Sequence, residues 1–446
     1  MSNKNPEIAG AITTPAHVVI VGLGYVGLPL AVAFSRHVGV TGLDIDETRV
    51  SELQQGRDHS GELATEELLD SGIEFTVDPS VVADAEFIIV AVPTPVLASF
   101  EPDLSYLEAA SRMVGQQLGG RTDGLRAPII VFESTTFPGC TEDVCGPIIE
   151  KQSGLVSGEG FLLGYSPERI NFGDREHTLE TVVKVTSGQT PEAASVIDRT
   201  YSLIATAGTH LAPNIMTAEA AKVIENVQRD LNIGLMNEIS YIFDRLGVST
   251  ADVLEAATTK WNFLPFRPGL VGGHCIPIDP YYLAYAAKAV GIHPRLILSA
   301  RETNEQMASF IAGKTVEILA GCQIDPKTAS VLVLGLAFKE NISDSRNSKA
   351  LELVMELRTQ VGNISVFDPL IPATQFTGIE DTFSGDPFVA DARFDAIVVA
   401  TPHDYFTSDG RDIKSLFKGE GGVLIDVTGR LGAEYMVSDG ITYWQP

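Results

Sequence analysis

The stretch HVVIVGLGYVGLPLAVAF, residues 17–34, starts as a β-branched run and passes through glycines into an apolar pattern with helical spacing. The run from His17 to Val21 predicts a strand, and Gly22-x-Gly24-x-x-Gly27 predicts a tight turn that leads into a helix. Such glycines let a pyrophosphate approach the helix N-terminus and let helix pack closely on strand. The glycine pattern is weak alone, but its place between a strand and a helix strengthens it.

An acidic residue supports a dinucleotide site. Asp44 ends the next apolar run, VTGLD (40–44), 22 residues after Gly22. An acid at this place hydrogen-bonds the ribose 2′-hydroxyl and repels a 2′-phosphate, so we expect NAD rather than NADP. A strand-end cap is the alternative interpretation of Asp44. Arg49 could contact the adenosine side, and a solvent-exposed helix arginine is the alternative.

The rest of the chain predicts an α/β fold of two Rossmann-like, doubly wound parallel-sheet domains joined by a helical central domain. Residues 1–212 form the NAD-binding domain, since the runs EFIIVAV (86–92) and APIIVFES (127–134) alternate with helix-like segments. Residues 213–322 form the central domain, which opens on a long helix with apolar positions on more than one side. Residues 323–446 return to strand texture in SVLVLGLAFKE (330–340), ISVFDP (364–369), FDAIVVATPHDYF (394–406) and GVLIDVTG (422–429).

The two α/β domains read as relatives of each other. The segment VVIVGLG aligns with VLVLGLA at an offset of 313 residues, and FIIVAVPTP aligns with AIVVATPHD at an offset of 309 residues. Chance similarity between apolar strands is the alternative. GLAFKE breaks the glycine pattern, so we expect the second domain to bind something other than a dinucleotide.

The composition limits the partners. The 446 residues include 58 acidic and 31 basic ones, a formal charge of −27 that repels nucleic acids and anionic membranes, and that is also compatible with a saline habitat. Four scattered cysteines, with no zinc spacing, predict no metal site and a reducing cytoplasm. The N-terminal MSNKNPEIAG lacks the features of a secretory signal, and no apolar run approaches the ~20 residues of a membrane span.

One cysteine stands in an unusual setting. GLVGGHCIPIDP (269–280) places Cys275 after a glycine pair and four residues before Asp279. A lone cysteine in an apolar context is more often a small buried hydrophobe than a nucleophile. The functional interpretation needs partner residues from elsewhere in the chain.

Seven segments together give a specific resemblance. They are VGLGYVGLPLA (21–31), VPTP (92–95), ESTTFPGCT (133–141), GYSPERINFGD (164–174), AEAAKVIENVQRDLN (218–232), KWNFLPFRPGLVGGHCIPIDPYYL (260–283) and GLAFKENISDSRNS (335–348). In this order they resemble the UDP-glucose/GDP-mannose dehydrogenase family, and most closely its bacterial UDP-N-acetylhexosamine 6-dehydrogenases of Vi-antigen and O-antigen synthesis.

The resemblance implies that the sugar C6 alcohol is oxidised twice, with two NAD⁺ reduced in turn. Cys275 then matches the nucleophile that forms a thiohemiacetal and a thioester. Asp279, which alone could be a turn former, matches an aspartate that helps activate water or accept a proton. Lys222 and Asn226 match a lysine and an asparagine that stabilise the oxyanion at C6; without the resemblance Lys222 would pass for a surface residue.

Further roles follow from the same resemblance. Thr135 and Glu168 match positions that hold or deprotonate the hydrolytic water, and whether Glu168 or Asp279 is the base stays open because both have a salt-bridge alternative. The cofactor residues are Gly22, Gly24, Tyr25, Val26, Gly27, Asp44, Arg49, Pro93, Thr94, Ser134 and Thr135. The substrate residues are Glu168, Arg169, Lys222, Asn226, Arg267, Gly272, Gly273, Lys339 and Arg346.

Some of these substrate roles have structural alternatives. Gly272 and Gly273 would let the substrate approach the backbone. Arg346 could bind the diphosphate bidentately, and an ion pair with Asp344 is the alternative. His274 is expected to shape its loop rather than act as a base.

The sequence departs from the UDP-glucose dehydrogenase pattern at one carboxylate. Those enzymes carry a second glutamate four residues after the first, whereas Phe172 occupies that place here. The role of the second carboxylate is therefore absent or moved. PERIN in place of PEFL, and GGHC in place of GGSC, point to an N-acetylhexosamine substrate.

The expected protein is a cytoplasmic NAD-dependent UDP-N-acetylglucosamine, or N-acetylgalactosamine, 6-dehydrogenase for surface polysaccharide. The alternatives are UDP-N-acetylmannosamine or UDP-glucose as substrate, and a noncatalytic nucleotide-sugar-binding regulator that keeps the fold. The apolar positions of the long helix exceed one buried face, so we also expect a homodimer.

Overall fold

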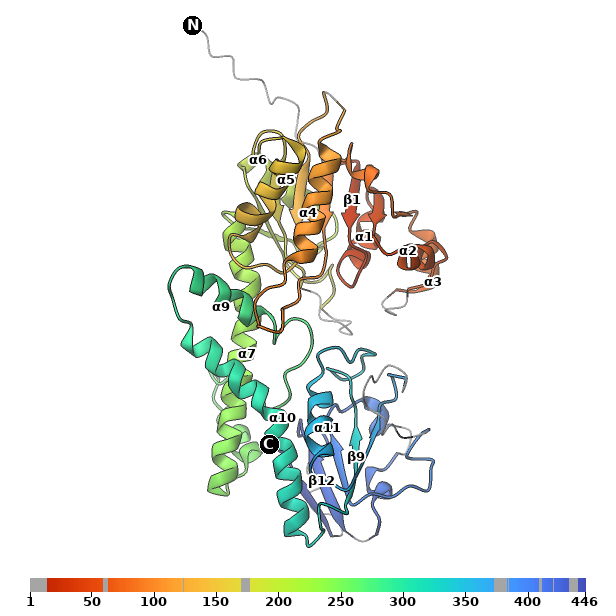
Figure 1. The fold of residues 1–446 in the computed structure, drawn as a ribbon, viewed down its shortest axis with the longest axis vertical. Helices are drawn as coiled ribbons and strands as arrows, with labels where there is room; N and C mark the ends of the chain where they lie inside the picture. The colour runs from red at the N-terminus through yellow and green to blue at the C-terminus, as the bar shows by residue number, and fades with distance from the viewer. Residues whose placement is uncertain are drawn as a thin grey trace. The chain divides into compact units, whose positions relative to one another are not determined.

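The computed structural model describes residues 14–58, 63–122, 124–169, 177–372, 383, 385–408, 411–419, 421–432 and 440–446. They divide into two compact units, drawn in Figure 1. The N-terminal unit consists of Met1–Ile224 and Tyr281–Val290, and the C-terminal unit of Glu225–Pro280 and Gly291–Pro446. Among the described residues, no helix combines the length and apolarity needed to cross a bilayer.

The N-terminal unit is built on a sheet whose described strands follow the order β3-β2-β1-β4-β5-β6-β7-β8. Neighbouring strands are parallel except β6 and β7, which pair antiparallel. The strands are β1 His17–Val21, β2 Gly39–Leu43, β3 Glu74–Thr76, β4 Phe87–Val90, β5 Ile129–Phe132, β6 Leu162–Tyr165, β7 Lys184–Gly188 and β8 Thr209–Leu211.

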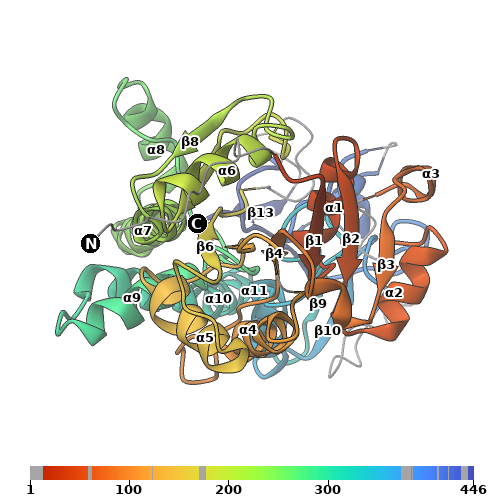
Figure 2. The ribbon, with the colours of Figure 1, turned by 90° about the horizontal axis from the view of Figure 1, so that it is seen from above.

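Helices cover both faces of this sheet because its central strands are apolar on both sides. Val18 and Ile20 of β1 pack with residues of α1 and α6, and Val19 and Val21 pack with residues of α4 and α5. Figure 2 shows α6 and the pair α4 and α5 on opposite sides of the strands. The helices are α1 Gly27–Ser35, α2 Glu47–Gln54, α3 Thr65–Asp70, α4 Ser105–Leu118, α5 Gly146–Ser153 and α6 Pro191–Tyr201.

The helical part of the chain begins with α7, Ile215–Leu246, as the absence of Gly and Pro from Asn214 to Ile233 predicts. The other helices of this part are α8 Thr250–Thr258, α9 Asp279–Ala289 and α10 Arg295–Gly321. The boundary between the two units falls inside α7, between Ile224 and Glu225.

The C-terminal unit contains a second sheet, in which the described strands are all parallel and follow the order β10-β9-β11-β12-β13. Residues of α10 and α11 pack on one face, and residues of two short 3₁₀ turns, Asp404–Phe406 and Ile413–Leu416, pack on the other. The elements are β9 Ser330–Leu334, α11 Lys349–Arg358, β10 Asn363–Phe367, β11 Ala396–Val399, β12 Gly422–Asp426 and β13 Ile441–Trp444.

The predicted fold class is confirmed, with one difference in the first sheet. The central order β2-β1-β4-β5 has its counterpart in β10-β9-β11-β12 of the second sheet. The difference is the reversed strand β7, which a doubly wound parallel sheet would not contain. The division of the chain at residues 212 and 322 stays a prediction.

Candidate active site

The glycine loop after β1 has the three environments that a dinucleotide turn requires. Gly22 adopts φ +93°, a left-handed conformation that side chains disfavour. A Cβ on Gly27, the first residue of α1, would lie 1.8 Å from the carbonyl oxygen of Gly22. A Cβ on Gly24, in contrast, would meet nothing within 4 Å. Gly24 therefore faces open space at the N-terminus of α1, where a pyrophosphate fits.

Asp44 and Arg49 both contact this loop. Leu23 N–H donates to Asp44 Oδ2 at 2.7 Å, and Asp46 N–H donates to Asp44 Oδ1 at 3.0 Å. Arg49 is buried, donates from Nε to the Leu23 carbonyl at 3.2 Å and pairs with Asp58 at 2.8 Å. The alternative of a solvent-exposed Arg49 is therefore wrong.

The loops after β4 and β5 lie at the same edge of the sheet as the glycine loop, because the three strands are parallel neighbours. Pro93 and Thr94 follow β4, and Ser134 and Thr135 follow β5. Ser134 Oγ donates to the Val92 carbonyl at 2.7 Å, which ties the two loops together. With Tyr25 and Val26 in the glycine loop, the predicted cofactor positions gather at this edge of the sheet, and the residues present fit NAD.

Glu219 of α7 is an important residue that the sequence analysis did not single out. It is fully buried and accepts hydrogen bonds from Thr136 Oγ1, Gly139 N–H and both Thr141 N–H and Oγ1, at 2.6–3.1 Å. Burial raises the pKa of Glu219, although these donors oppose the shift. Glu219 thereby fixes the segment after Thr135 to the helix turn that carries Lys222. Lys222 is 4% exposed and is no surface residue.

Glu168 and Arg169 follow β6 in the N-terminal unit. The Glu168 side chain is 10% exposed, and its Oε2 accepts from Lys184 Nζ at 3.3 Å, while its Oε1 accepts from Arg169 N–H. Arg169 donates to the Ala221 carbonyl at 3.0 Å, next to Lys222. The rest of the SPERINF motif, including Phe172, lies outside the described residues.

Cys275 and its predicted partners Asn226 and Asp279 lie in the C-terminal unit. The Cys275 thiol is exposed, and its carbonyl oxygen accepts the N–H of Asp279 at 2.9 Å. Asp279 is 1% exposed and accepts from Asn226 Nδ2 at 2.6 Å, while Asn226 Oδ1 accepts from Arg229 at 3.0 Å. The structure thus brings Asn226 and Asp279 together at the start of the helix that follows Cys275.

The glycine pair before Cys275 is explained by packing within the protein. A Cβ on Gly272 would lie 2.8 Å from the Asn347 carbonyl oxygen, and one on Gly273 would lie 2.8 Å from the Phe338 ring. Gly273 also adopts φ +91°. The space beside both α-carbons therefore holds the 338–347 segment, so packing within the protein already requires glycine at both positions, and their contact with substrate stays a prediction.

Arg346 takes the ion-pair alternative. Its guanidinium donates to both oxygens of Asp344, at 2.7–3.2 Å, and His274 Nε2 lies 3.2 Å from Asp344 Oδ2. Burial alone would raise the pKa of Asp344, but the hydrogen bonds from His274 and Arg346 hold that pKa well below its ordinary value. The contact of His274 with Asp344 is compatible with the predicted role of His274 in shaping its loop, which stays a prediction.

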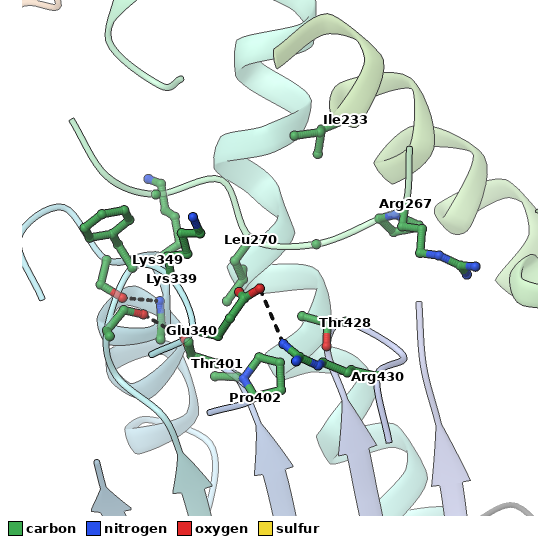
Figure 3. Close-up of a pocket in the computed structure, with 18 of the residues that line it drawn as sticks. Ile233, Arg267, Leu270, Lys339, Glu340, Lys349, Thr401, Pro402, Thr428 and Arg430 are labelled. Atoms are coloured by element: carbon green, nitrogen blue, oxygen red, sulfur yellow. Dashed lines mark hydrogen bonds and ion pairs between the residues drawn. The ribbon is translucent and has the colours of Figure 1, made fainter. Parts of the chain in front are cut away.

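A cavity of about 590 Å³ opens in the C-terminal unit at the carboxyl ends of β9, β11 and β12. This size suits a small-molecule ligand, and the switch between β9 and β11 is where open α/β sheets bind ligands. Figure 3 shows Lys339 and Glu340 after β9, Thr401 and Pro402 after β11, and Thr428 and Arg430 after β12.

Basic residues are concentrated around this cavity in an otherwise acidic chain. Lys339, Gly272 and Arg267 were predicted, although the Arg267 guanidinium points away from the other labelled side chains in Figure 3. Lys349 and Arg430 were not predicted. Lys349 pairs with Glu305 and Glu352, and Arg430 pairs with Glu340 at 3.4 Å. The position of Lys349 could have indicated an anion site, because it follows Ser348, the N-cap of α11, and a helix N-terminus favours anions.

Comparisons with known proteins agree with this geometry over nearly the whole chain. Models of the UDP-glucose/GDP-mannose dehydrogenase family match residues 16–205 as the NAD binding domain, 216–306 as the central domain and 332–432 as the UDP binding domain. The chain belongs to this family of NAD-dependent nucleotide-sugar dehydrogenases.

Several individual proteins are similar to this chain over most of its length. A UDP-N-acetyl-D-glucosamine 6-dehydrogenase of Pseudomonas aeruginosa is 46% identical over 90% of this chain and 94% of its own, and one of Salmonella typhi is 43% identical over 94% and 97%. Protein CapL of Staphylococcus aureus is 44% identical over 94% and 97%. The solved structure of the UDP-D-ManNAc dehydrogenase of Pyrococcus horikoshii has a TM-score of 0.84 at 32% identity and covers 96% of this chain and 98% of its own.

Proposed function

We propose that this dehydrogenase oxidises C6 of UDP-N-acetylglucosamine or UDP-N-acetylgalactosamine to the carboxylate. The relatives of 43–46% identity that are named UDP-N-acetyl-D-glucosamine 6-dehydrogenases support this substrate class. The observation that carries the reaction is the exposed thiol of Cys275, one turn before the buried pair of Asp279 and Asn226. Cys275 is exposed, whereas Cys140 and Cys145 are buried, so Cys275 is the better candidate for the nucleophile.

NAD⁺, when bound at the glycine loop, supplies the acceptor for hydride in both oxidations. Cys275 sulfur bonds to the C6 aldehyde carbon and gives a thiohemiacetal, whose oxidation leaves a thioester on the same sulfur. Lys222 and Asn226 stabilise the oxygen at C6 as negative charge develops. Asp279 orients Asn226 through the 2.6 Å hydrogen bond.

Hydrolysis of the thioester releases the product. A water held by Thr135 loses a proton to Glu168, its oxygen bonds to the thioester carbon, and the carbon–sulfur bond breaks to return the Cys275 thiolate. We assign the base to Glu168 rather than Asp279 because Asp279 is 1% exposed, whereas the Glu168 side chain is 10% exposed.

The uridine diphosphate would bind in the cavity of the C-terminal unit. Lys339 and Arg430 are the cations at its rim, and the N-terminus of α11 adds backbone donors. Arg267 and Arg346 would have to turn toward the ligand, and Arg346 would have to leave Asp344. We also propose a cytoplasmic homodimer that supplies a surface polysaccharide, a role that fits the similarity to protein CapL.

A substrate panel with the purified chain tests this function. NADH formation with UDP-N-acetylglucosamine should exceed that with UDP-glucose, and each uronate should account for two NADH. A preference for UDP-glucose would contradict the prediction of an N-acetylhexosamine substrate. A preference for UDP-N-acetylmannosamine would support the alternative of a UDP-N-acetylmannosamine 6-dehydrogenase. Absence of turnover with all of these sugars, despite NAD binding, would favour the noncatalytic regulator.

Cys275→Ala tests the covalent mechanism. The variant should lose uronate formation by several orders of magnitude while it still binds NAD and UDP-sugar, because only the nucleophile is removed. Cys322→Ala is the matched control, since Cys322 is also an exposed thiol but lies at the end of α10 beside Thr442. Full turnover of Cys275→Ala, measured as uronate by mass spectrometry, would contradict the mechanism.

A further inference from the structure

Lys184 is a buried cation for which the proposed reaction gives no role. It is 3% exposed, and its ammonium donates to Glu133 Oε2 at 2.7 Å, the Pro167 carbonyl at 3.0 Å and Glu168 Oε2 at 3.3 Å. A lysine has three N–H donors, so these acceptors use them all. Lys184 thus bridges two carboxylates, and we call Glu133, Lys184 and Glu168 the bridged cluster.

The reversed strand explains why the three residues meet. Glu133 follows β5 and Glu168 follows β6, so both stand at the carboxyl edge of parallel strands. Lys184 is the first residue of β7, which runs antiparallel to β6 with Tyr165 opposite Ser187 and Gly164 opposite Gly188. Continued by three residues, this register places Lys184 opposite Glu168. A parallel β7 would place its first residue at the other edge of the sheet.

Glu133 differs from Glu168 in its surroundings. It is 2% exposed, and its Oε1 has no hydrogen-bond partner among the described residues. The charged and titratable groups that face it are Lys184 from β7, Glu168 from the loop after β6 and Tyr201 from α6. Burial raises the pKa of Glu133 to about 7, against the favourable charge of Lys184.

Lys184 and Tyr201 keep fixed charge states over the neutral range. Burial disfavours the Lys184 ammonium, but the charges of Glu133 and Glu168 raise its pKa above the ordinary value. Burial and the charge of Glu133 raise the pKa of Tyr201, whose ring lies 5.3 Å from Lys184 Nζ. Glu133 is therefore the member of this surrounding whose charge changes near neutral pH.

We propose that Lys184 and Glu133 are positioning residues for Glu168. Lys184 orients the Glu168 carboxylate, and Glu133, directly after β5, is a second carboxylate held by the same ammonium. The proposal rests on the proposed function in that Glu168 takes the proton from the hydrolytic water.

The two positioning residues act on Glu168 differently. Lys184 contacts Glu168 directly and favours its ionised form, whereas Glu133 contacts Lys184 and is protonated below about pH 7. Removal of Lys184 should therefore move the acidic limb of the pH profile of kcat to higher pH. Glu133→Gln should leave a limb below about pH 7 in place, because it removes no charge there. A merely structural role would not move the limb in one variant alone.

The kinetic test uses the full chain with NAD⁺ and UDP-N-acetylglucosamine. Lys184→Met should lower kcat on the order of a hundredfold, the low end of what a positioned base contributes, with little change in KM. Its acidic limb should move up by about one pH unit or more. The thioester on Cys275 should accumulate, which mass spectrometry of the quenched enzyme detects.

Three further variants complete the kinetic test. Lys184→Arg should restore most of kcat because it keeps the cation, and Glu133→Gln should leave the limb in place because Glu133 is already protonated below about pH 7. Lys151→Met is the matched control, an exposed lysine in the last turn of α5, and should match the wild type. If Lys184→Met does not fold, the double variant Lys184→Met with Glu133→Gln is used, because it removes opposite charges together. The double variant should still move the acidic limb to higher pH, because it loses the direct contact between Lys184 and Glu168.

A stability measurement tests the cluster without turnover. A raised pKa means that folded Glu133 binds its proton more tightly than the unfolded chain does, so stability should fall as pH rises from its ordinary value of 4.5 to about 7. Glu133→Gln should flatten this part of the curve, measured by urea denaturation across that range.

The outcomes separate the two proposals. Wild-type protein that forms no NADH with any UDP-sugar refutes the proposed function, and with it the role of Lys184 in catalysis. An active enzyme in which Lys184→Met leaves the limb unmoved, or in which both variants move it the same way, refutes the positioning role alone. An unchanged slope of stability with pH in Glu133→Gln refutes the assigned titration of Glu133.

Discussion

Gly24 and Gly27 stand three residues apart in one loop, and each needs to be glycine for a different reason. A Cβ on Gly27 would overlap the Gly22 carbonyl oxygen, so the packing of the protein itself excludes a side chain. The space beside Gly24 is open, so only a ligand there would exclude one. The pattern in the sequence predicts the loop but does not distinguish these reasons.

Alanine at the two positions should therefore separate folding from binding. Gly24→Ala should keep the melting temperature and weaken NAD binding about tenfold or more, roughly 1.4 kcal/mol, by calorimetric titration. Gly27→Ala should lower the melting temperature because α1 must move away from β1. Unchanged NAD affinity in Gly24→Ala would contradict the assignment of this open space to the cofactor.

Single side chains at loop ends were the hardest to predict. Asp44 has one oxygen bound to Leu23 N–H, so it shapes the glycine loop in addition to any contact with ribose. Arg346 has its charge paired by Asp344, two residues away. For both residues the sequence allows a ligand contact and a contact within the protein. The backbone conformation of the loop decides which of these contacts the side chain makes.

At the scale of the element, α7 carries a polar stripe that the apolar periodicity concealed. Glu219, Lys222, Asn226, Asp230 and Asn237 recur at spacings of three, four or seven residues and are all nearly fully buried. Such spacings place side chains on one face of a helix. The spacing of these polar residues was visible in the sequence, but polar residues on a helix are usually expected to face solvent.

Asn237 holds the chain segment that leads to Cys275. Its side-chain amide donates to the Gly269 carbonyl at 3.1 Å and accepts the Gly269 N–H at 2.8 Å. It also donates to Asn304 Oδ1 at 2.8 Å, and Asn304 in turn binds Asp230, which pairs with Arg301. The amide therefore fastens the segment of Arg267 and Cys275 to a buried polar network.

Asn237→Ala should destabilise the C-terminal unit by about 1–3 kcal/mol, because buried backbone groups of Gly269 lose their partner. kcat should also fall, since the segment carrying Cys275 is loosened. Asn232→Ala is the control on the same helix, where the amide only binds the Gln228 carbonyl, and should cost less than ~0.5 kcal/mol. Chemical denaturation of the two variants measures the difference, and equal losses would contradict this role of Asn237.

The long strands were predicted because they are apolar runs bounded by turn residues. The runs predicted around residues 17–21, 40–44, 86–92 and 127–134 became β1, β2, β4 and β5, and those in the last third became β9 to β12. β3, β6, β7, β8 and β13 were not predicted, and each of them has only three to five residues. The reversal of β7 depends on its partner β6, and no pattern within KVTSG records it.

At the scale of the whole molecule, the two halves use the same strand end differently. Asp368 follows β10 as Asp44 follows β2, and it accepts from Leu336 and Ala337 N–H at 2.7–3.0 Å. Its Oδ2 also lies 3.0 Å from His403 Nε2, and both side chains are buried. The acid of the second sheet is thus committed to internal contacts, in agreement with the expectation of a ligand other than a dinucleotide.

The predicted homodimer has a candidate surface in the C-terminal unit. Leu235, Leu246 and Trp261 are 53%, 68% and 96% exposed, and we expect the dimer to cover them. Leu235→Asp with Leu246→Asp should shift the mass in light scattering from dimer to monomer. Leu69→Asp, a leucine of α3 that is 59% exposed, is the control and should not. A monomeric wild type would contradict the dimer.

The boundary between the two units inside α7 has a consequence for how the enzyme can be dissected. The units are joined at that point by a continuous helix and not by a linker. Cleavage or truncation after Ile224 would therefore cut this helix, and several main-chain carbonyls would lose the N–H groups that donate to them. Exchange of one half for that of a relative would have to keep the helical phase across the junction. The modular appearance of the chain therefore overstates how freely its parts can be recombined.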